Sequence, residues 1–440
     1  MKTIVLGLGV SGKAAVRFLL KQGQSVLGID SDRHYLETNR HSFPSDLVYQ
    51  HDTDLIDWDC VERVVVSPGI SPKNPIYQTA IVKGIEIIGE TELALPHFQK
   101  PIVAVTGTNG KTTVALLVEH VLNRAGIKAK AIGNVGIPPC DYLMNPGPEE
   151  AFVVELSSFQ LETLKTPVFD AAVLLNITPD HLDRYADMGA YAKAKSQIQY
   201  LMKKESSLFI QTQLFNEFAH LFPLKNYQTF GMEKGSDLWT DQTLVQYREK
   251  IEYLMPIEYR EMGRHDNENV LAAWVLCRPF SISNEQFCSG LATFRKPPHR
   301  IEWVREIEGV SFYDDSKGTN VDAVIQAVGT MKGAVILIVG GVDKGASYLP
   351  WKERFLGKVK LIIAIGAAAP KIYRELHPYF NIKLADSLSL AVELAAKGAK
   401  RGDSVLLSPG CSSYDMFESY AERGEEFQRH VQSIEVRREP

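Results

Sequence analysis

The sequence lacks long apolar runs, paired cysteines and any excess of basic residues. Its apolar runs, such as Ala334–Val339, are far shorter than the roughly eighteen residues that a membrane-spanning helix needs. The five cysteines are scattered, and no two form a Cys-x-x-Cys pair. Lys and Arg number 48 against 53 Asp and Glu, so a net charge of −5 offers no basic field for nucleic acid. We therefore expect a reduced, cytoplasmic protein with no signal peptide, no membrane contact and no nucleic-acid partner.

What the chain does contain is the alternating pattern of an α/β protein. Short β-branched segments end in glycine or another turn residue and lead into helix-like stretches, a pattern that favours parallel sheets. The predicted strands are Lys2–Leu6, Ser25–Ile29, Arg63–Val66, Ile102–Val105, Phe152–Leu156, Ala171–Leu175, Ala334–Val339, Lys360–Ile365 and Ser404–Leu407.

The length of 440 residues predicts about three domains, at roughly 150 residues each. Two proline-flanked stretches, Leu95–Pro101 and Phe294–Arg300, suit joints, because proline disfavours a helix at the residue before it. We therefore expect domains at residues 1–93, 94–297 and 298–440.

The first motif is a glycine turn, Gly7–Gly12, between a predicted strand and a predicted helix. Its G-x-G-x-x-G pattern, with Asp30 at the end of the next strand, is typical of dinucleotide binding. Taken alone it predicts an NAD-dependent enzyme, but the motif does not say which nucleotide or nucleotide-sugar is bound. The less favoured alternative is a turn that only packs helix against strand. The stretch Asp30–Arg33 could also start a helix.

The second motif, Thr106–Thr113, joins a strand to a helix through Gly-Thr-Asn-Gly-Lys-Thr. The backbone of such a turn can cradle phosphates, while lysine reaches their oxygens and the following hydroxyl can ligate Mg²⁺. The strict pattern G-x-x-x-x-G-K-[ST] would need glycine where Val105 stands, so only its second half is present. We predict ATP or GTP binding. An enzyme that consumes ATP while it holds a nucleotide-linked substrate would use both motifs.

Polar residues follow several later strands. Glu155 and His181 each follow an apolar strand and suit a divalent cation near the phosphates. Lys193 and Lys195 lie in a helical stretch, where composition alone favours a solvated lysine face. Gly263–Asn269 is predicted as a turn and cap before a helix at 270–276. Three strand-end loops, at 314–320, 339–345 and 408–415, make a second binding wall plausible.

With these motifs in order, the sequence resembles the Mur ligases of peptidoglycan synthesis over essentially its whole length. The resemblance rests on Gly7–Gly12, Thr106–Thr113, Glu155–Glu162, Asn176–Arg184, His299–Arg300, Asp315–Asn320, Gly340–Gly345 and Ser408–Gly424. It implies an N-terminal Rossmann-like domain that holds a uridine diphosphate, a central P-loop ATPase-like domain with a mainly parallel sheet, and a C-terminal Rossmann-like domain that brings in an amino acid.

The resemblance also implies an activity. The enzyme would be an ATP-dependent, ADP-forming ligase that adds D-glutamate to UDP-N-acetylmuramoyl-L-alanine through an acyl phosphate. It would use two Mg²⁺ ions and a carbamylated Lys195, with Lys193 as the alternative site of carbamylation. We expect a monomer. Alternatives are another Mur-type ligase, folylpolyglutamate synthase or, in a different class, a nucleotide-gated binding protein.

Roles for single residues follow from the same resemblance. Lys111, His181 and Lys195 would be catalytic, and the metal ligands would be Thr112, Glu155, His181 and Lys195. The ATP contacts would be Gly107, Thr108, Asn109, Gly110, Lys111, Thr112, Thr113, Asn269, Arg300, Asp315 and Lys317. The UDP substrate would lie against Val10, Ser11, Asp30, Ser31 and Asn134, and D-glutamate against Thr319, Lys344, Ser413 and Tyr420. Two positions depart from the family pattern: Asp32, followed by Arg33, stands at an expected arginine, and Tyr420 at an expected phenylalanine.

Overall fold

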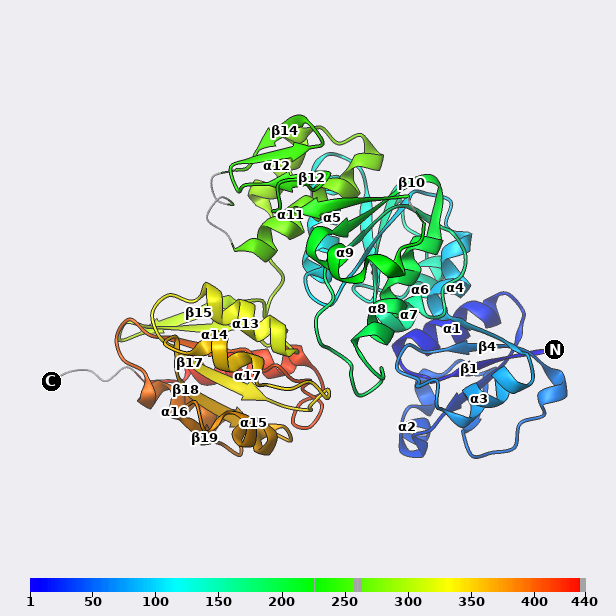
Figure 1. Ribbon diagram of the computed structural model, residues 1–440. Helices are drawn as coiled ribbons and strands as arrows, with labels where there is room; N and C mark the ends of the chain where they lie inside the picture. The colour runs from blue at the N-terminus through cyan, green and yellow to red at the C-terminus, as the bar shows by residue number, and fades with distance from the viewer. Residues whose placement is uncertain (225, 257–258, 260–262, 436–440) are drawn as a thin grey trace. The chain divides into compact units, whose positions relative to one another are not determined.

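The computed structural model describes residues 1–440 except 225, 257–258, 260–262 and 436–440, and it contains three mostly parallel sheets (Figure 1). The chain forms two compact units. The first consists of Met1–Ile177 with Gly189–Phe294, and the second of Thr178–Met188 with Arg295–Pro440. The first unit holds two of the sheets and the second unit holds one. The expected boundaries after residues 93 and 297 stay a prediction.

The first sheet has the order β3-β2-β1-β4-β5, and all its strands are parallel. Alternate side chains of each strand point to opposite faces, so both faces carry a core. Val5 and Val65 pack with α1 on one face, and Ile4 and Val64 pack with α3 on the other. The elements are β1 (Lys2–Leu6), α1 (Val10–Lys21), β2 (Ser25–Asp30), α2 (Arg33–Thr38), β3 (Val48–His51), β4 (Val61–Val66), α3 (Pro75–Val82), β5 (Glu86–Gly89) and α4 (Glu90–Ala94).

The second sheet has nine strands in the order β14-β13-β12-β11-β10-β9-β6-β8-β7. Its parallel part contains β6 (Ile102–Thr106), β7 (Ala129–Gly133), β8 (Ala151–Leu156), β9 (Phe169–Leu174), β10 (Met202–Gln211), β11 (Tyr227–Gly231) and β12 (Leu238–Thr240), and β13 (Leu244–Tyr247) and β14 (Lys250–Leu254) are antiparallel. Helices α5 (Lys111–Arg124), α11 (Arg264–Cys277) and α12 (Asn284–Thr293) pack on one face. Shorter helices are α6 (Pro139–Met144), α7 (Ser158–Leu161), α8 (Met188–Ser196) and α9 (Thr212–Phe218).

The third sheet, in the second unit, has the order β15-β16-β20-β17-β18-β19. Only β15 (Glu302–Ile307) is antiparallel to its neighbour; the other strands are β16 (Val310–Asp314), β17 (Val335–Gly340), β18 (Val359–Ile365), β19 (Ile382–Leu384) and β20 (Ser404–Leu407). Helices α13 (Val321–Thr330), α14 (Pro350–Phe355) and α15 (Ala369–Leu376) cover one face, and α16 (Leu388–Gly398) and α17 (Tyr420–Gln432) the other.

Every strand predicted from the sequence coincides with an observed strand to within two residues at each end. The prediction of a turn and cap at Gly263–Asn269 holds for the cap, since Gly263 is the N-cap of α11, but the turn was wrong, because the helix already begins at Arg264. One contact within the helix and one tertiary contact support these polar helical residues. The carboxylate of Glu268 accepts hydrogen bonds from Arg264 Nε at 2.9 Å and from Gln211 Nε2 at 3.0 Å, so packing overrides local propensity.

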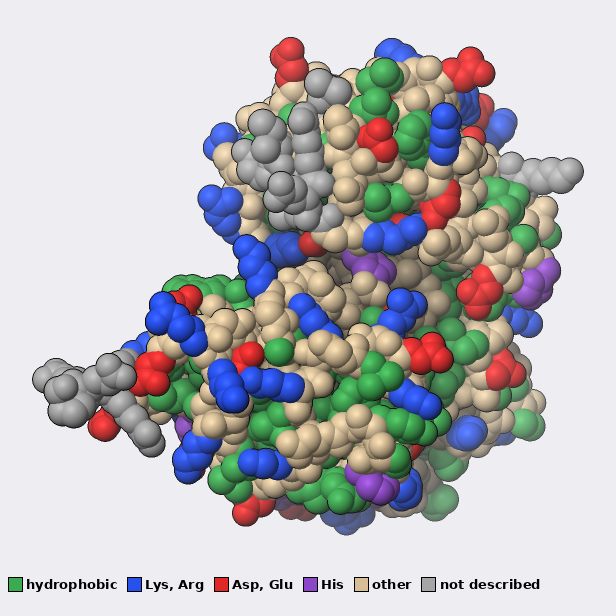
Figure 2. Space-filling view, turned by 60° about the vertical axis from the view of Figure 1, so that its left-hand side comes forward, with side chains coloured by type: hydrophobic (Ala, Val, Ile, Leu, Met, Phe, Trp, Pro, Cys, Tyr) green, Lys and Arg blue, Asp and Glu red, His purple; other side chains and the backbone are tan. Residues whose placement is uncertain are grey.

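The surface carries mixed charges. Figure 2 shows Lys and Arg side chains interspersed with acidic and neutral ones on the face that it presents. Among the described residues, no helix has both the length and the apolar character needed to cross a membrane.

Helices α4 and α6, which meet near the first predicted joint, share a buried carboxyl group. Glu90 is 3 % exposed, and its Oε1 accepts a hydrogen bond from the backbone N–H of Cys140 at 2.6 Å. Beside it, Arg17 on α1 pairs with Asp141 on α6 at 2.7 Å. Burial raises the pKa of Glu90 to about 7, against the pull of the Cys140 hydrogen bond. The helices therefore meet around a carboxyl group that is mostly protonated below about pH 7.

This burial predicts a pH-dependent stability. Because the pKa of Glu90 is higher in the folded chain than its ordinary 4.5, folding costs nothing extra below pH 4.5, and the cost grows as pH rises to about 7. The shift corresponds to at most about 3 kcal/mol. We expect Glu90→Gln to raise the free energy of unfolding by about 1–3 kcal/mol at pH 8 and to change it little at pH 4.5.

Urea unfolding at the two pH values measures this difference. Glu92→Gln, on the same helix, is the matched control, because the partly exposed Glu92 accepts hydrogen bonds from the backbone N–H groups of Lys165 and Thr166. A gain for Glu90→Gln that is equal at both pH values would contradict the assignment.

Candidate active site

The predicted phosphate loop joins β6 to α5. Gly107 (φ 152°) and Gly110 (φ 87°) adopt backbone conformations that favour glycine, and a Cβ at Gly110 would lie 2.4 Å from Asn269 Oδ1. The Nζ of Lys111 donates to the carbonyl oxygens of Gly107 and Thr108, both at 2.8 Å. The loop thus places a lysine ammonium beside the positive end of a fourteen-residue helix, an arrangement suited to phosphate.

Asn176, which follows β9, braces this loop. Its carbonyl oxygen accepts a hydrogen bond from Thr108 N at 2.9 Å, and its side-chain oxygen accepts one from Asn109 N at 2.8 Å. Its Nδ2 donates in turn to Asn109 O at 3.0 Å. Sequence reasoning placed Asn176 only at the start of a motif and gave it no role.

Glu155 lies in a position suited to binding a cation. It lies on β8, directly beside β6, in register with Val105 and only 1 % exposed. Its Oε1 accepts a hydrogen bond from Asn134 Nδ2 at 2.7 Å, whereas its buried Oε2 has no hydrogen-bond partner among the described residues. A buried carboxylate oxygen in this state is costly unless a cation or water meets it. Thr112, in the first turn of α5, adds a hydroxyl to this edge, so the donor set fits Mg²⁺.

The two lysines of α8 differ sharply in burial. Lys193 is exposed, but Lys195 is 1 % exposed, and its Nζ donates to Gly107 O at 2.9 Å. Tyr191 lies beneath the Lys195 ammonium, 4.9 Å from ring centroid to Nζ, and its hydroxyl group is 3.2 Å from Thr108 Oγ1. The prediction of a solvated lysine face is therefore wrong for Lys195, which is buried, and is confirmed for Lys193, which is exposed.

The glycine turn of the first sheet is shaped by Asp30. Its two carboxylate oxygens accept hydrogen bonds from Leu8 N at 2.7 Å and from Asp32 N at 3.1 Å. Asp32 is the N-cap of α2, so the expected helix start is also present. A Cβ at position 12 would lie 1.8 Å from Gly7 O, so only glycine fits at Gly12.

The surface around this turn is accessible. Val10 is 74 % exposed and Ser11 follows it in the first turn of α1, while the exposed Ser31 directly follows β2. His51 Nε2 lies 3.0 Å from Ser31 O and helps line a hollow of about 340 Å³ with Arg33 and Arg40.

In the second unit, the three predicted strand-end loops do lie together, because β16, β20 and β17 are neighbours. Ser408 Oγ donates to Asp315 Oδ2 at 2.6 Å, and Gly410 N donates to Gly318 O at 2.8 Å. Val342 and Ser412 form an antiparallel bridge. These contacts join the loops into one wall.

Arg423, which sequence reasoning missed, ties this wall together from α17. Its guanidinium group is 1 % exposed and donates to Ser316 Oγ and O, to Cys411 O and to Gly340 O, at 2.9 to 3.4 Å. Burial lowers the pKa of Arg423 to about 10, so it remains charged at neutral pH. Arginine in a polar helix gives no sequence signal for such a role.

Asp315 and Lys317 follow β16. Burial raises the pKa of Asp315 to about 7, while Ser408 and Arg300 act to lower it. The Nζ of Lys317 lies 3.8 Å from the ring centroid of Tyr420. The ring at position 420 thus packs beneath a cation, a contact that tyrosine and phenylalanine both allow.

Lys344 lies in a buried ion pair. Its Nζ is 3.0 Å from Asp180 Oδ1 and 3.5 Å from Thr319 Oγ1, while Ser413 is buried in the adjoining loop. Asp180 and His181 belong to the segment Thr178–Met188, which packs as part of the second unit. His181 has a φ of 56°, and its ring Nε2 lies 3.6 Å from Asp180 Oδ2. Asp180, another residue that sequence reasoning missed, thereby links the predicted amino-acid wall to the segment that carries His181.

These features define the class of protein. A glycine loop with a lysine lies beside a buried carboxylate at the edge of a parallel sheet, as expected of an enzyme that binds a nucleoside triphosphate. Three family models match along the chain: "Mur ligase MurD-like, N-terminal domain" over residues 1–89, "Mur ligase middle domain" over 105–277 and "Mur ligase, glutamate ligase domain" over 299–411. The chain belongs to the Mur ligase family.

Curated relatives match over nearly the whole length. The UDP-N-acetylmuramoylalanine--D-glutamate ligase of Protochlamydia amoebophila is 46 % identical over 438 residues, which cover 98 % of both chains. The enzyme of the same name from Coxiella burnetii is 36 % identical over 448 residues, covering 98 % of this chain and 99 % of the relative.

Solved structures share the three-domain α/β fold. UDP-N-acetylmuramate-alanine ligase MurC from Thermotoga maritima superposes with a TM-score of 0.61 at 15 % identity, covering 98 % and 99 % of the two chains. MurF ligase from Thermotoga maritima in complex with ADP gives a TM-score of 0.61 at 16 % identity, covering 92 % and 95 %.

Proposed function

We propose that this chain joins D-glutamate to UDP-N-acetylmuramoyl-L-alanine with ATP, as an ADP-forming ligase of peptidoglycan precursor synthesis. The observation that carries the proposal is the 46 % identity to a D-glutamate ligase over 98 % of both chains, together with family models that reach all three sheets. The phosphate loop and the orphaned oxygen of Glu155 support the ATP requirement.

ATP lies with its phosphates against Gly107–Thr113 and with its remaining contacts from Asn269, Arg300, Asp315 and Lys317. Thr112 and Glu155 hold one Mg²⁺, a role that the bare, buried Oε2 of Glu155 supports. His181 and a carbamylated Lys195 hold the second. When bound, the two ions neutralise charge on the phosphates. Lys195 suits modification because a carbamate turns a buried cation into a carboxylate-like group beside the loop.

The chemistry begins with a carboxylate that is a poor acceptor for an amine, because its leaving group would be oxide. Transfer of the γ-phosphoryl group from ATP to the alanyl carboxylate makes an acyl phosphate and ADP. The ammonium of Lys111 stabilises the charge that moves with the phosphoryl group. The amine of D-glutamate then attacks the acyl carbon, and phosphate leaves with formation of the amide.

Substrate contacts are assigned on the two walls. The UDP end of the acceptor lies against Val10, Ser11, Asp30 and Ser31, where the hollow lined by Arg33 and His51 adds basic groups. Asn134, held by Glu155, contacts the acceptor.

D-Glutamate lies against Thr319, Lys344, Ser413 and Tyr420. Its carboxylate would share the ammonium of Lys344 with Asp180, because a lysine ammonium has three N–H donors.

Further assignments accompany this proposal. Its nucleotide substrates place the protein in the cytoplasm, where it acts as a monomer without a nucleic-acid or membrane partner. The domains span residues 1–93, 94–297 and 298–440.

A phosphate-release assay tests the proposal. We expect ADP and phosphate to form only with ATP, Mg²⁺, UDP-N-acetylmuramoyl-L-alanine and D-glutamate together. Turnover with L-glutamate and a folate, but not with these substrates, would instead identify a folylpolyglutamate synthase. Tight ATP binding without turnover under any substrate pair would favour a nucleotide-gated binding protein, and dinucleotide binding at the Gly7–Gly12 turn an NAD enzyme.

A further inference from the structure

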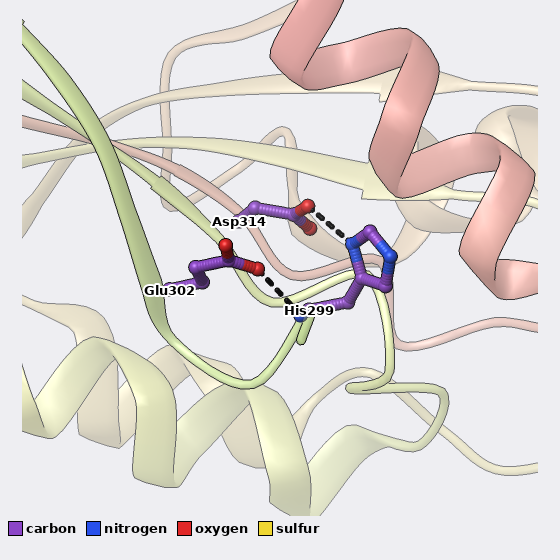
Figure 3. A group of neighbouring side chains, drawn as sticks. All are labelled: His299, Glu302 and Asp314. Carbon is purple, nitrogen blue, oxygen red and sulfur yellow. Dashed lines mark hydrogen bonds and ion pairs between the residues drawn. The ribbon is translucent and has the colours of Figure 1, made fainter. Parts of the chain in front are cut away.

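The connection into the second unit ends in a buried group of polar side chains, which we call the His299 knot: His299, Glu302, Asp314 and Gln428. Figure 3 shows the first three, with Asp314 facing the imidazole ring of His299 and Glu302 facing its backbone nitrogen. Glu302 begins β15, Asp314 ends β16 and Gln428 lies on α17. The knot therefore fastens the connection to two strands and a helix of the second unit.

The knot is closed by short hydrogen bonds. His299 Nδ1 lies 2.7 Å from Asp314 Oδ2, and His299 N donates to Glu302 Oε2 at 2.8 Å. Gln428 Nε2 donates to Asp314 Oδ2 at 2.9 Å and to Glu302 Oε2 at 3.2 Å. Ser316 N donates to the second oxygen of Asp314 at 2.9 Å.

The same group has the composition of a metal site, since possible ligand atoms of His299, Glu302 and Asp314 lie within 4.8 Å of one another. Its bonding points elsewhere. Both oxygens of Asp314 and the Oε2 of Glu302 already accept N–H groups, and the amide of Gln428 donates to both carboxylates. Because the amide of Gln428 bridges the two carboxylates, the group is a hydrogen-bonded knot.

The knot holds a strained turn. His299 (φ 61°) and Ile301 (φ 53°) both lie in the left-handed region, which is strained for residues other than glycine. Such strain persists only where the surroundings fix the backbone. The surroundings pack closely at Gly424 on α17, where a Cβ would lie 2.2 Å from His299 Nδ1 and 2.8 Å from Asp314 Oδ2.

The turn bears directly on three residues assigned to the nucleotide. Arg300 lies between the two strained positions and helps to stabilise the ionised carboxylate of Asp315, as does the backbone N–H of Ile301. The carbonyl oxygen of His299 accepts a hydrogen bond from the backbone N–H of Lys317 at 3.1 Å. A change in the turn would therefore displace Arg300, Asp315 and Lys317 together.

We propose that His299 is a positioning residue for ATP: through Asp314 it locks the strained turn that presents Arg300 and sets Asp315 and Lys317. This inference rests on the proposed function, since it assigns these three residues to the nucleotide. The D-glutamate wall depends less on His299, because Arg423 ties its loops together separately and the His299 ring reaches it at Tyr420, with the two ring centroids 6.3 Å apart.

The test compares His299→Leu with His299→Asn in the full-length enzyme. Leucine removes the donor to Asp314, whereas asparagine can supply an amide N–H and tolerates a left-handed backbone. We expect His299→Leu to raise the KM for ATP about tenfold or more, with the KM for D-glutamate and kcat at saturating ATP changed less than about threefold. His299→Asn should stay within about threefold of the parent in KM for ATP.

Asp314→Asn is the second variant, and fluorescent-nucleotide titration reads ATP affinity without turnover. If His299 acts through Asp314, the double variant His299→Leu/Asp314→Asn should bind ATP no more weakly than the worse single variant. Equal rises in KM for all substrates, or equal loss in His299→Leu and His299→Asn, would overturn the positioning role. Stoichiometric bound metal that Asp314→Asn removes would overturn the hydrogen-bonded knot. A parent enzyme that binds ATP but does not ligate would refute the proposed function instead.

Discussion

Lys111→Ala should reduce turnover by about a thousandfold or more while leaving the chain folded. The Lys111 ammonium lies over the carbonyl oxygens of Gly107 and Thr108, at the point where the loop would receive phosphate. Removing it leaves the charge of the moving phosphoryl group without its nearest protein cation. Because this side chain is only partly buried and packs on its own loop, the free energy of unfolding should change little.

The rate of phosphate release at saturating substrates measures the loss, and thermal unfolding checks the fold. Lys128→Ala is the matched control, since this exposed lysine lies in the turn beyond the other end of α5. It should behave as the parent does. Parent-like turnover by Lys111→Ala would show that the phosphate-loop assignment is wrong.

Lys195→Ala should be inactive, with a loss of about a hundredfold or more, and should recover in part when acetate is added. If Lys195 carries a carbamate, the missing group is a carboxylate-like metal ligand, and a small carboxylate can enter the cavity left by the shortened side chain. The burial of Lys195 against Gly107 O makes that cavity part of the loop.

Lys193→Ala tests the alternative site of carbamylation, because Lys193 lies on the same helix but is exposed. We expect it to retain parent activity. Rescue of Lys195→Ala by methylamine but not by acetate would show that the free amine, and no carbamate, does the work. Normal activity of Lys195→Ala without any additive would refute a role for this residue altogether.

The parallel sheets could be predicted because their strands are continuous apolar runs closed by turn residues. Strands β10 and β13, by contrast, mix buried and exposed positions, so no continuous apolar run marks their full length. The start of α11 was missed because local propensity favours a turn at Gly263–Asn269, whereas a hydrogen bond from Gln211, at the end of β10, to Glu268 supports a helix.

The candidate site, too, could be predicted only in part. The phosphate loop is contiguous in sequence and its chemistry is visible there, as are the polar loops after β16, β17 and β20. Burial decides the rest: Lys195 could not be separated from Lys193 by composition, and Arg423 resembles any arginine on a polar helix. The pairing of Asp180 with Lys344 spans 164 residues, so only the fold could reveal it.

The most direct measurement is product analysis of a complete reaction with each enantiomer of glutamate. Given ATP, Mg²⁺ and UDP-N-acetylmuramoyl-L-alanine, we predict that D-glutamate gives a product heavier than the acceptor by one glutamyl residue. One phosphate should be released for each product molecule, and L-glutamate should give neither. A product with L-glutamate and none with D-glutamate, or phosphate release without a new amide, would contradict the proposed function.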